Sequence, residues 1–310
     1  MTLAKPTPKH QAPPLKFIKS PFNYIGGKYR LLDQLVPLFP SDIETFVDIF
    51  SGGCNVGINV LAKKHLFNDM NTKLNEFFSF LQHKNPDDVI KSINSRIASY
   101  QLSKTNLEGF LQFRSDYNAN PNPLDLYILV SFSYNYQLRF NNNLEFNNPF
   151  GKNRSHFSNN MEKNLHAFMT KLNELNAEFS TFFFEDFNYS QLSNKDFVYF
   201  DPPYLITTGN YNDGNRGFKN WDETEEFKLY ALMDRLTHLG IRWALSNVLT
   251  HKGCEHAHLI KHVQLRGYQM NPLDFNYDNA SYNSKKKGSH EVLITNYCTH
   301  TFELLPIWMD

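Results

Sequence analysis

The sequence predicts a doubly wound α/β fold that carries a helical insertion between its two halves. Three observations predict it. Short apolar runs alternate with helical patterns toward both ends of the chain, the middle of the chain loses strand-like runs, and 41% of the 310 residues are hydrophobic. Alternating strands and helices indicate a parallel sheet, and this apolar content is enough for a sizeable core.

Residues 17–74 are expected to form the first part of the α/β domain, behind a loose, proline-rich tail at residues 1–16. Within this part we predict a helix, a strand, a second helix and a second strand at residues 26–39, 45–53, 55–65 and 65–69. The first helix follows from apolar residues at helical spacing. Strand, tight glycine turn, helix and strand is the usual opening of a doubly wound fold.

Residues 75–177 are expected to form an inserted helical domain, because alternation disappears there and asparagine becomes dense. Residues 178–310 are expected to form the second part of the α/β domain. We predict its strands at residues 180–187, 196–204, 241–247 and 291–297, and an amphipathic helix over residues 223–240 that ends at Gly240.

The composition argues against a secreted, disulfide-rich or membrane-spanning protein, but the net charge does not indicate a binding partner. The chain has 31 basic and 31 acidic residues, a balance that still allows a local basic face. Three cysteines without a pattern fit a reducing cytosol. No apolar run approaches transmembrane length, and the N-terminus lacks the apolar core of a secretory signal. We therefore expect a cytoplasmic protein that does not enter membranes.

A ligand is expected where the first two predicted strands end. Asp48 and Phe50 lie at the end of the first strand, and Gly52 lets the backbone approach a ligand closely. Asp69 ends the second strand, where an acidic residue often accepts hydrogen bonds from ribose hydroxyls. The dinucleotide fingerprint is broken at Cys54, and tight packing or a helix cap are alternatives. We assign these positions to a nucleotide-like cofactor.

Lys28 stands in the first turn of the first predicted helix, directly after two glycines. The helix dipole disfavours a cation at this position. An anionic ligand group, either a carboxylate or a phosphate, would explain it, and a solvated lysine is the alternative. A Walker A loop fits poorly, because Tyr29 stands where serine or threonine is required.

The segment Asp201-Pro202-Pro203-Tyr204 follows a predicted buried strand. Proline fixes its own φ and restricts the preceding residue to extended geometry. The Asp201 carboxylate and the Pro202 carbonyl thus become two rigid acceptors, which suit an amino group with two hydrogens. Tyr204 offers a ring face for stacking. The segment predicts a receptor for an amino group on a planar heterocycle, with a capping aspartate as the alternative.

In this order, SPFNYIGGKYRLL, FVDIFSGGCNVGIN, FNDMN and VYFDPPY resemble the Dam-type DNA adenine-N6 methyltransferases of the α group. The resemblance implies a Rossmann-like S-adenosylmethionine-dependent methyltransferase fold with a helical target-recognition insertion. It implies that Asp201, Pro202 and Tyr204 are catalytic. The implied contacts of S-adenosylmethionine are Tyr24, Lys28, Asp69 and Asp201, with Asp186 and Phe187 beside its adenine.

The segment YNYQLRFNNNLEFNNPFGK resembles the DNA-reading segment of the GATC-modifying members. The resemblance implies that Tyr134 wedges into the base stack, that Asn135 helps at the flipped site and that Arg139 pairs with a guanine edge. It places Pro149 near base methyl groups. Further DNA-binding candidates in this segment are Gln137, Asn141 and Lys152.

The same segment departs from the family pattern in ways that leave the recognition sequence open. Asn23 stands where a lysine reads the first base, Gln137 replaces an apolar residue, and Leu144 replaces a glycine. GATC and CATG both remain candidates. Positive charge favours DNA here, and residues 285–287, three consecutive lysines, could add phosphate contacts or be a solvated loop. The local cations are Arg139, Lys152, Arg154, Lys163 and Lys171.

The implied reaction methylates the N6 atom of an adenine flipped out of double-stranded DNA, in restriction-modification or phage DNA protection. A separately acting restriction endonuclease and a monomeric or weakly dimeric state are left open. The alternatives are an RNA methyltransferase, a catalytically silent DNA-binding regulator and a nicotinamide oxidoreductase. Serine or asparagine in place of Asp201 would instead indicate cytosine or glutamine as the target.

Residues 251–258 contain a cluster of potential zinc ligands, His251, Cys254, His256 and His258. Zinc prefers such side chains. The cluster has one cysteine and a histidine spacing that matches no known finger, so we expect no metal.

Overall fold

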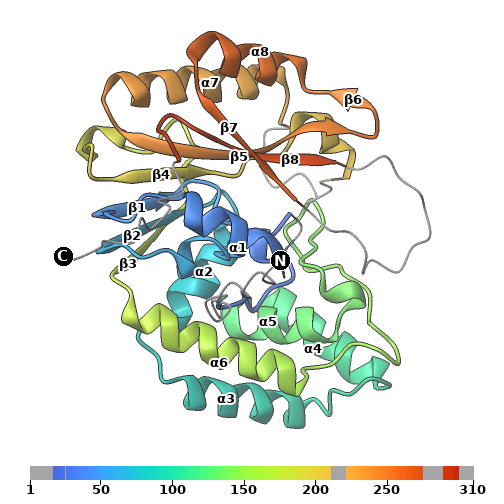
Figure 1. The fold of residues 1–310 in the computed structure, drawn as a ribbon. Coiled ribbons are helices and arrows are strands. Elements are labelled where there is room, and N and C mark those ends of the chain that lie inside the picture. The colour runs from blue at the N-terminus through green and yellow to red at the C-terminus, as the bar shows by residue number, and fades with distance from the viewer. Residues whose placement is uncertain (1–16, 25, 211–220, 275–288, 300–310) are drawn as a thin grey trace, which may run out of the picture.

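The computed structural model describes residues 17–24, 26–210, 221–274 and 289–299 (Figure 1). The predicted tail at residues 1–16 and the lysine run at residues 285–287 lie outside these ranges. Within them, no helix is both long and apolar enough to span a bilayer.

A mostly parallel sheet of eight strands forms the centre of the molecule. Its strands are β1 (Thr45–Asp48), β2 (Lys64–Asn68), β3 (Ala177–Ser180), β4 (Phe197–Phe200), β5 (Arg242–His251), β6 (Cys254–Glu255), β7 (Gln269–Leu273) and β8 (His290–Thr295). The order is β3-β2-β1-β4-β5-β8-β7, with β6 paired to β5. The strands from β3 to β5 are parallel, whereas β8 and β7 are antiparallel. The predicted α/β fold is confirmed.

Helices cover both faces of this sheet. α7 (Glu223–His238) and α8 (Ala257–Arg266) lie on one face, at the top of Figure 1. The other face is covered by η1 (Lys28–Leu31), α1 (Leu32–Leu35) and η2 (Val36–Leu38). Successive residues of β4 point to opposite layers: Val198 packs with the α7 and α8 side, Tyr199 with the α1 side. Both faces of the central strands are therefore buried, as in other parallel sheets.

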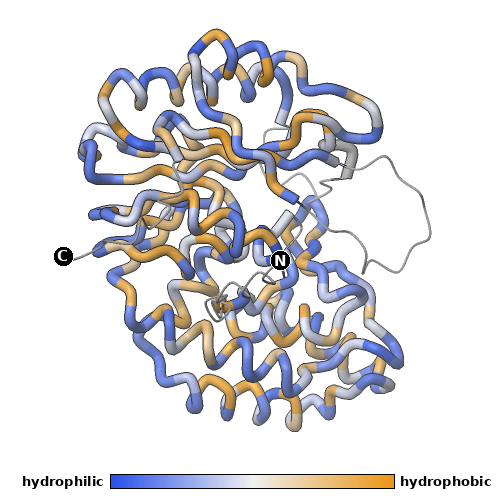
Figure 2. Tube along the Cα trace, in the orientation of Figure 1, coloured by the Kyte–Doolittle hydropathy of each residue, from blue (hydrophilic) through white to orange (hydrophobic). Residues whose placement is uncertain are grey.

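Between β2 and β3 the chain forms five helices, α2 (Thr72–Leu81), α3 (Pro86–Ser99), α4 (Leu107–Ala119), α5 (Pro123–Phe132) and α6 (Asn159–Glu174). Figure 1 shows α3, α4, α5 and α6 gathered below the sheet. α5 is buried along most of its length, as expected of a helix that is apolar on all sides. Figure 2 shows apolar residues along the strands and along the inner sides of these helices. The predicted boundary between residues 74 and 75 falls inside α2.

The dense asparagines of this helical part begin its helices. Asn71, Asn85, Asn106 and Asn122 are the N-caps of α2, α3, α4 and α5, and each side chain accepts a backbone N–H from the first turn. Such caps typically contribute about 1 kcal/mol each. The polar composition of the segment thus reflects helix starts as well as loops.

Two predicted elements differ from the structure. Instead of a helix, residues 55–65 contain the short turn η3 (Gly57–Asn59) and the first two residues of β2. Residues 51–58 are all buried, so an amphipathic helix would have no exposed face, and a Cβ on Gly57 would lie 2.3 Å from the Phe67 ring. The strand expected at residues 180–187 is β3, which ends at Ser180, and Phe184 turns into the core instead.

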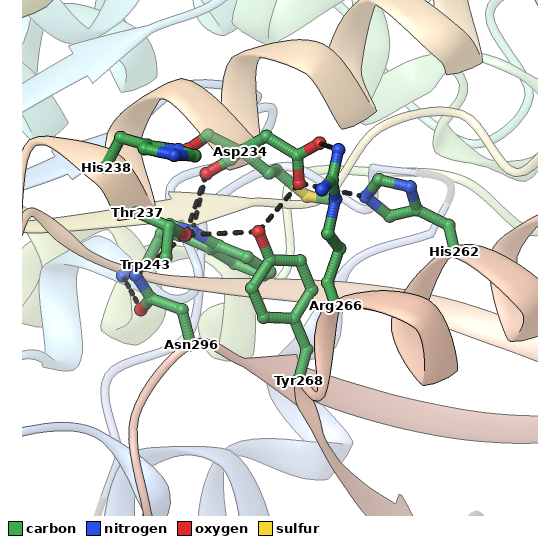
Figure 3. A network of polar contacts seen from close by, with 9 residues as sticks. Asp234, Thr237, His238, Trp243, His262, Arg266, Tyr268 and Asn296 are labelled. Atoms are coloured by element: carbon green, nitrogen blue, oxygen red, sulfur yellow. Dashed lines mark hydrogen bonds and ion pairs between the residues drawn. The ribbon is translucent and has the colours of Figure 1, made fainter.

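A polar network joins α7 to α8 and was not predicted (Figure 3). Asp234 on α7 accepts hydrogen bonds from the Tyr268 hydroxyl and from Arg266, each at 2.7 Å. His262 Nε2 lies 3.3 Å from the same carboxylate. The network fixes α8 on the outer face of the sheet.

Candidate active site

Three carboxylates from neighbouring parallel strands meet at the carboxyl edge of the sheet. Asp48 is the last residue of β1, Asp69 follows β2 and Asp201 follows β4. These strands are adjacent and parallel, so their ends open onto the same edge. This edge is where open α/β sheets bind ligands.

Lys28, which follows the glycine pair before the first helix, forms an ion pair with Asp201 of the Asp-Pro-Pro-Tyr segment. Its Nζ atom lies 2.9 Å from Asp201 Oδ1 and donates to the Gly26 carbonyl at 2.8 Å. The Tyr204 hydroxyl donates to the same Asp201 Oδ1 at 3.0 Å, and Lys28 Nζ lies 5.0 Å from the centre of the Tyr204 ring. The anion that explains a lysine in this first helical turn is therefore, in this structure, Asp201 itself. Lys28 and Asp201 are only 5% and 16% exposed.

Burial raises the pKa of two of these carboxylates, Asp48 and Asp201. Burial raises the pKa of the Asp201 carboxyl above its ordinary value, although the Lys28 ammonium opposes the shift. Burial, and then the like charges of Asp201 and Asp69, raise the pKa of Asp48 well above its usual range. Burial and like charge therefore both disfavour the ionised form of Asp48.

The glycine turn after β1 is held by Asp69. Gly52 has φ +46°, and its N–H donates to Asp69 Oδ2 at 2.8 Å. A Cβ on Gly52 would lie 3.0 Å from the ring of Tyr24, so the turn and this ring pack without space between them. Asp69 Oδ1 also accepts the Asn71 N–H at 2.8 Å. Asp69 therefore shapes the turn that was predicted to face a cofactor.

The residues at this edge fit S-adenosylmethionine. Asp48 Oδ1 and Ser51 Oγ are buried and have no hydrogen-bond partner within the described part of the chain. Such orphaned atoms at a glycine turn suit a ligand with several hydroxyl and amino groups. The Lys28 ammonium can meet a carboxylate, and Asp69 is a carboxylate that can meet hydroxyls.

A family model for the D12 class N6 adenine-specific DNA methyltransferases matches residues 24–287. The chain belongs to this family. It is 60% identical over 290 residues to "Modification methylase StsI" of Streptococcus sanguinis, covering 94% of the chain and 44% of the relative. It is 52% identical over 285 residues to "Type II methyltransferase M.FokI" of Planomicrobium okeanokoites, covering 92% and 44%.

The chain spans less than half the length of these two relatives, since 44% of each is covered. It is also 27% identical over 197 residues to "DNA adenine methylase" of Escherichia coli (strain K12), covering 61% of the chain and 66% of that relative. The resemblance to Dam-type methyltransferases is thereby confirmed, at lower identity than the resemblance to modification methylases.

Two aromatic residues that were not predicted as part of the site, Phe184 and Trp221, lie beside Phe50. Phe50 packs against Phe184 and Trp221, with ring centres 5.8 and 5.6 Å apart. Of the two residues expected beside the cofactor adenine, Phe187 is buried against Tyr189 and the other, Asp186, is exposed. Phe184 carries no distinguishing signal in a sequence with 28 phenylalanines, which explains why it was missed.

The segment expected to read DNA is an exposed hairpin-like loop. Its ends meet through bridges between Ser133 and Phe150 and between Phe140 and Phe146. Asn148 is buried and its Nδ2 group donates to Ser133 Oγ and to the Tyr134 carbonyl at 2.8 and 3.0 Å. The predicted DNA contacts exposed on this loop are Tyr134, Asn135, Gln137, Arg139, Pro149 and Lys152, whereas Asn141 is half-buried.

Tyr134 is an exposed aromatic residue with a cation over its ring. Tyr134 is 45% exposed, and the Arg154 guanidinium lies 5.2 Å from the centre of its ring. Asn135 follows with φ +56°, a left-handed conformation that asparagine tolerates better than most residues. The loop thus presents an aromatic side chain flanked by a cation, which suits contact with nucleic acid.

Leu144 has φ +62°, a left-handed conformation that glycine adopts without strain. Its side chain is 55% exposed, so little packing is lost on truncation. We expect Leu144→Gly to raise the free energy of unfolding by about 0.5–1 kcal/mol, because relief of left-handed strain exceeds the entropy cost of glycine. Denaturant unfolding measures this change.

Leu107→Gly is the matched control, since Leu107 is 47% exposed but begins α4 with helical geometry. It should destabilise the protein. Equal destabilisation by both substitutions would contradict the assignment of strain to Leu144.

The potential zinc ligands of residues 251–258 are dispersed. His256 is buried and lies 3.3 Å from Glu226, whereas Cys254 is exposed and His251 contacts Ser289. No group of three or more metal-ligating side chains was found among the described residues.

Proposed function

We propose that this chain transfers a methyl group from S-adenosylmethionine to the N6 atom of an adenine flipped out of duplex DNA, in a short GATC-like or CATG-like site. The observation that carries the proposal is the geometry of Asp201. Lys28 and Tyr204 both engage Oδ1, and no described residue donates a hydrogen bond to Oδ2. The names of the relatives support a role in restriction-modification. Protection of phage DNA is the alternative role.

The cofactor supplies an electrophilic methyl group on a sulfonium when it is bound. Lys28 would hold its carboxylate, Asp69 would accept from its hydroxyls, and Gly52 would let the backbone approach. The remaining residues proposed to hold it are Tyr24, Asp48, Phe50, Asp186, Phe187 and Asp201. The half-buried Phe50, set against two further rings, would offer its face to the cofactor adenine.

Asp201 and Pro202 would activate the target nitrogen. The lone pair of the adenine amino group is conjugated with the ring, so the amino group is a poor nucleophile. Asp201 Oδ2 and the Pro202 carbonyl would each accept one N–H, which favours a pyramidal nitrogen with a localised lone pair. The fixed carboxylate also stabilises the positive charge that develops on the nitrogen, and this preorganised electrostatic effect is usually a large part of catalysis.

Flipping the adenine out of the duplex breaks its stacking and base pairing, which costs a few kcal/mol. New contacts with the protein have to offset this free energy. Tyr204 would stack on the extruded base, and Tyr134 would enter the vacated space. Arg139 would read a guanine edge, with Asn135, Gln137, Asn141, Pro149 and Lys152 as further contacts. The exposure of Tyr134 and Arg139 on one loop supports this division of roles.

The raised pKa of Asp201 gives a predicted pH dependence. Asp201 has to be ionised to accept the amino group, and burial raises the pKa of this carboxyl above the ordinary value of 3.8. We therefore expect single-turnover methyl transfer to fall on acidification at a pH above that of an ordinary aspartate. Rates measured from pH 4 to pH 8 test this (roughly the range that spans carboxyl titration). A rate that stayed constant to the acid limit of folding would contradict it.

A titration with S-adenosylmethionine, followed by transfer of its labelled methyl group to duplex DNA, single-stranded DNA and RNA, tests the function. We expect cofactor binding and transfer to duplex DNA. A protein that binds DNA but does not bind S-adenosylmethionine would be a silent regulator. Preferential transfer of the methyl group to RNA would identify an RNA methyltransferase. Either result would overturn the proposal.

A further inference from the structure

Glu291 is a carboxylate that faces the active-site layer and that the mechanism above does not use. It lies on β8, where it pairs with Val248 on β5 and with Leu273 on β7. Side chains alternate along a strand, so Glu291 shares a face with Leu293 and not with Val292. Leu293 and Leu273 pack with the α1 layer, which begins at Lys28. Glu291 therefore points toward the layer that contains Lys28.

The position of Glu291 along the sheet brings it to the carboxyl edge. Phe200, which precedes Asp201, pairs with Leu245 on β5, and Val248 lies three residues further toward the end of the strand. The register shifts directly after Val248, and bulges of this kind often redirect a side chain beside an active site. Glu291 and Asp201 thus approach the same edge from β8 and β4.

The charges around Glu291 agree with this placement. Burial raises the pKa of the Glu291 carboxyl, the Lys28 ammonium lowers it, and the charge of Asp201 raises it again. Glu291 Oε2 is buried and accepts no hydrogen bond from any described residue. A buried carboxylate oxygen without a partner, within the electrostatic reach of an ammonium and a second carboxylate, indicates an electrostatic role.

Glu291 lies on the side of Asp201 away from the proposed cofactor residues. In the sheet order, β2 and β1 carry Asp69 and the glycine turn, β4 carries Asp201, and β5 and β8 follow. A contribution of Glu291 is thus expected in the half of the site that receives the base.

We propose that Glu291 is a positioning residue for methyl transfer, which acts through Lys28. Glu291 faces the Lys28 layer from β8, which is separated from β4 by β5. Its negative charge would add to the electrostatic hold on the ammonium, so that Lys28 remains at Asp201 Oδ1 and Oδ2 remains available to the adenine amino group. This inference rests on the proposed function.

Glu291→Gln, which removes the charge and keeps the shape, tests the inference in single-turnover methylation of duplex DNA at several pH values. We expect the single-turnover rate constant for methyl transfer to fall about tenfold. Asp201 and Glu291 repel each other as like charges, so removal of the Glu291 charge should move the acid limb of the rate to lower pH. Glu291→Asp, which keeps the charge, should restore the wild-type limb.

Glu255→Gln is the matched control, because Glu255 is an exposed glutamate on β6. It should behave as the wild type. A wild-type rate constant for methyl transfer in Glu291→Gln, or a lower rate constant with an unshifted acid limb in a folded protein, would overturn the inference. Failure of the wild-type protein to methylate any adenine would instead overturn the proposed function, so the two failures are distinguishable.

Discussion

Asp201→Ala is expected to bind S-adenosylmethionine and DNA but to lose methyl transfer by at least roughly 10²–10³-fold, the usual cost of removing one preorganised electrostatic group. The substitution removes the acceptor for one amino hydrogen and the charge that stabilises the developing cation. Single-turnover transfer of a labelled methyl group measures the loss. Near-normal turnover would end the catalytic assignment.

The alanine substitution has a second consequence that requires a companion variant. It leaves the Lys28 ammonium, which is 5% exposed, without its ion-pair partner. Breaking a buried pair in this way typically costs about 3–5 kcal/mol. Asp201→Asn keeps the shape of the side chain and an oxygen acceptor, and we expect it to fold and still lose activity. Asp88→Asn, an exposed aspartate in the first turn of α3, is the control and should retain full activity.

Arg139→Ala is expected to relax or abolish discrimination between DNA sites. A bidentate contact with a guanine edge contributes about 1–3 kcal/mol of discrimination. The guanidinium is exposed on a loop whose base is fixed by the buried Asn148, so truncation should leave the fold intact. Methylation rates on the preferred site and on its single mismatches measure the effect.

Lys152→Ala provides the contrast, because an exposed lysine that meets a phosphate should weaken binding to every sequence about equally. If Arg139→Ala left the mismatch penalties unchanged, Arg139 would also be a phosphate contact and not a reader of bases.

The placement of three carboxylates at one edge of the sheet was predictable because each of them stands where a strand ends. Asp48, Asp69 and Asp201 each follow an apolar strand, and parallel strands bring such positions to one edge. The ion pair between Lys28 and Asp201 was not predictable from local patterns, since its partners are distant in the sequence. The sequence could place each of them near a ligand but could not show that they bind each other.

Errors in the predicted fold arose where burial overrides periodicity. Residues 55–65 have helical apolar spacing, yet the burial of residues 51–58 leaves room only for a short turn. β7 was missed because Pro272 argues against a strand, and the proline is accommodated because β7 is at the edge of the sheet. α8 was missed because the histidines before and within it were considered as metal ligands.

Methylation of a random-sequence duplex pool, followed by identification of every modified base, tests the central claim most directly. If Asp201 Oδ2 and the Pro202 carbonyl hold an extruded adenine by its amino group, the new methyl groups will all be on adenine N6 and within one short sequence. Methyl groups on cytosine, or none on DNA in the presence of bound cofactor, would contradict the account.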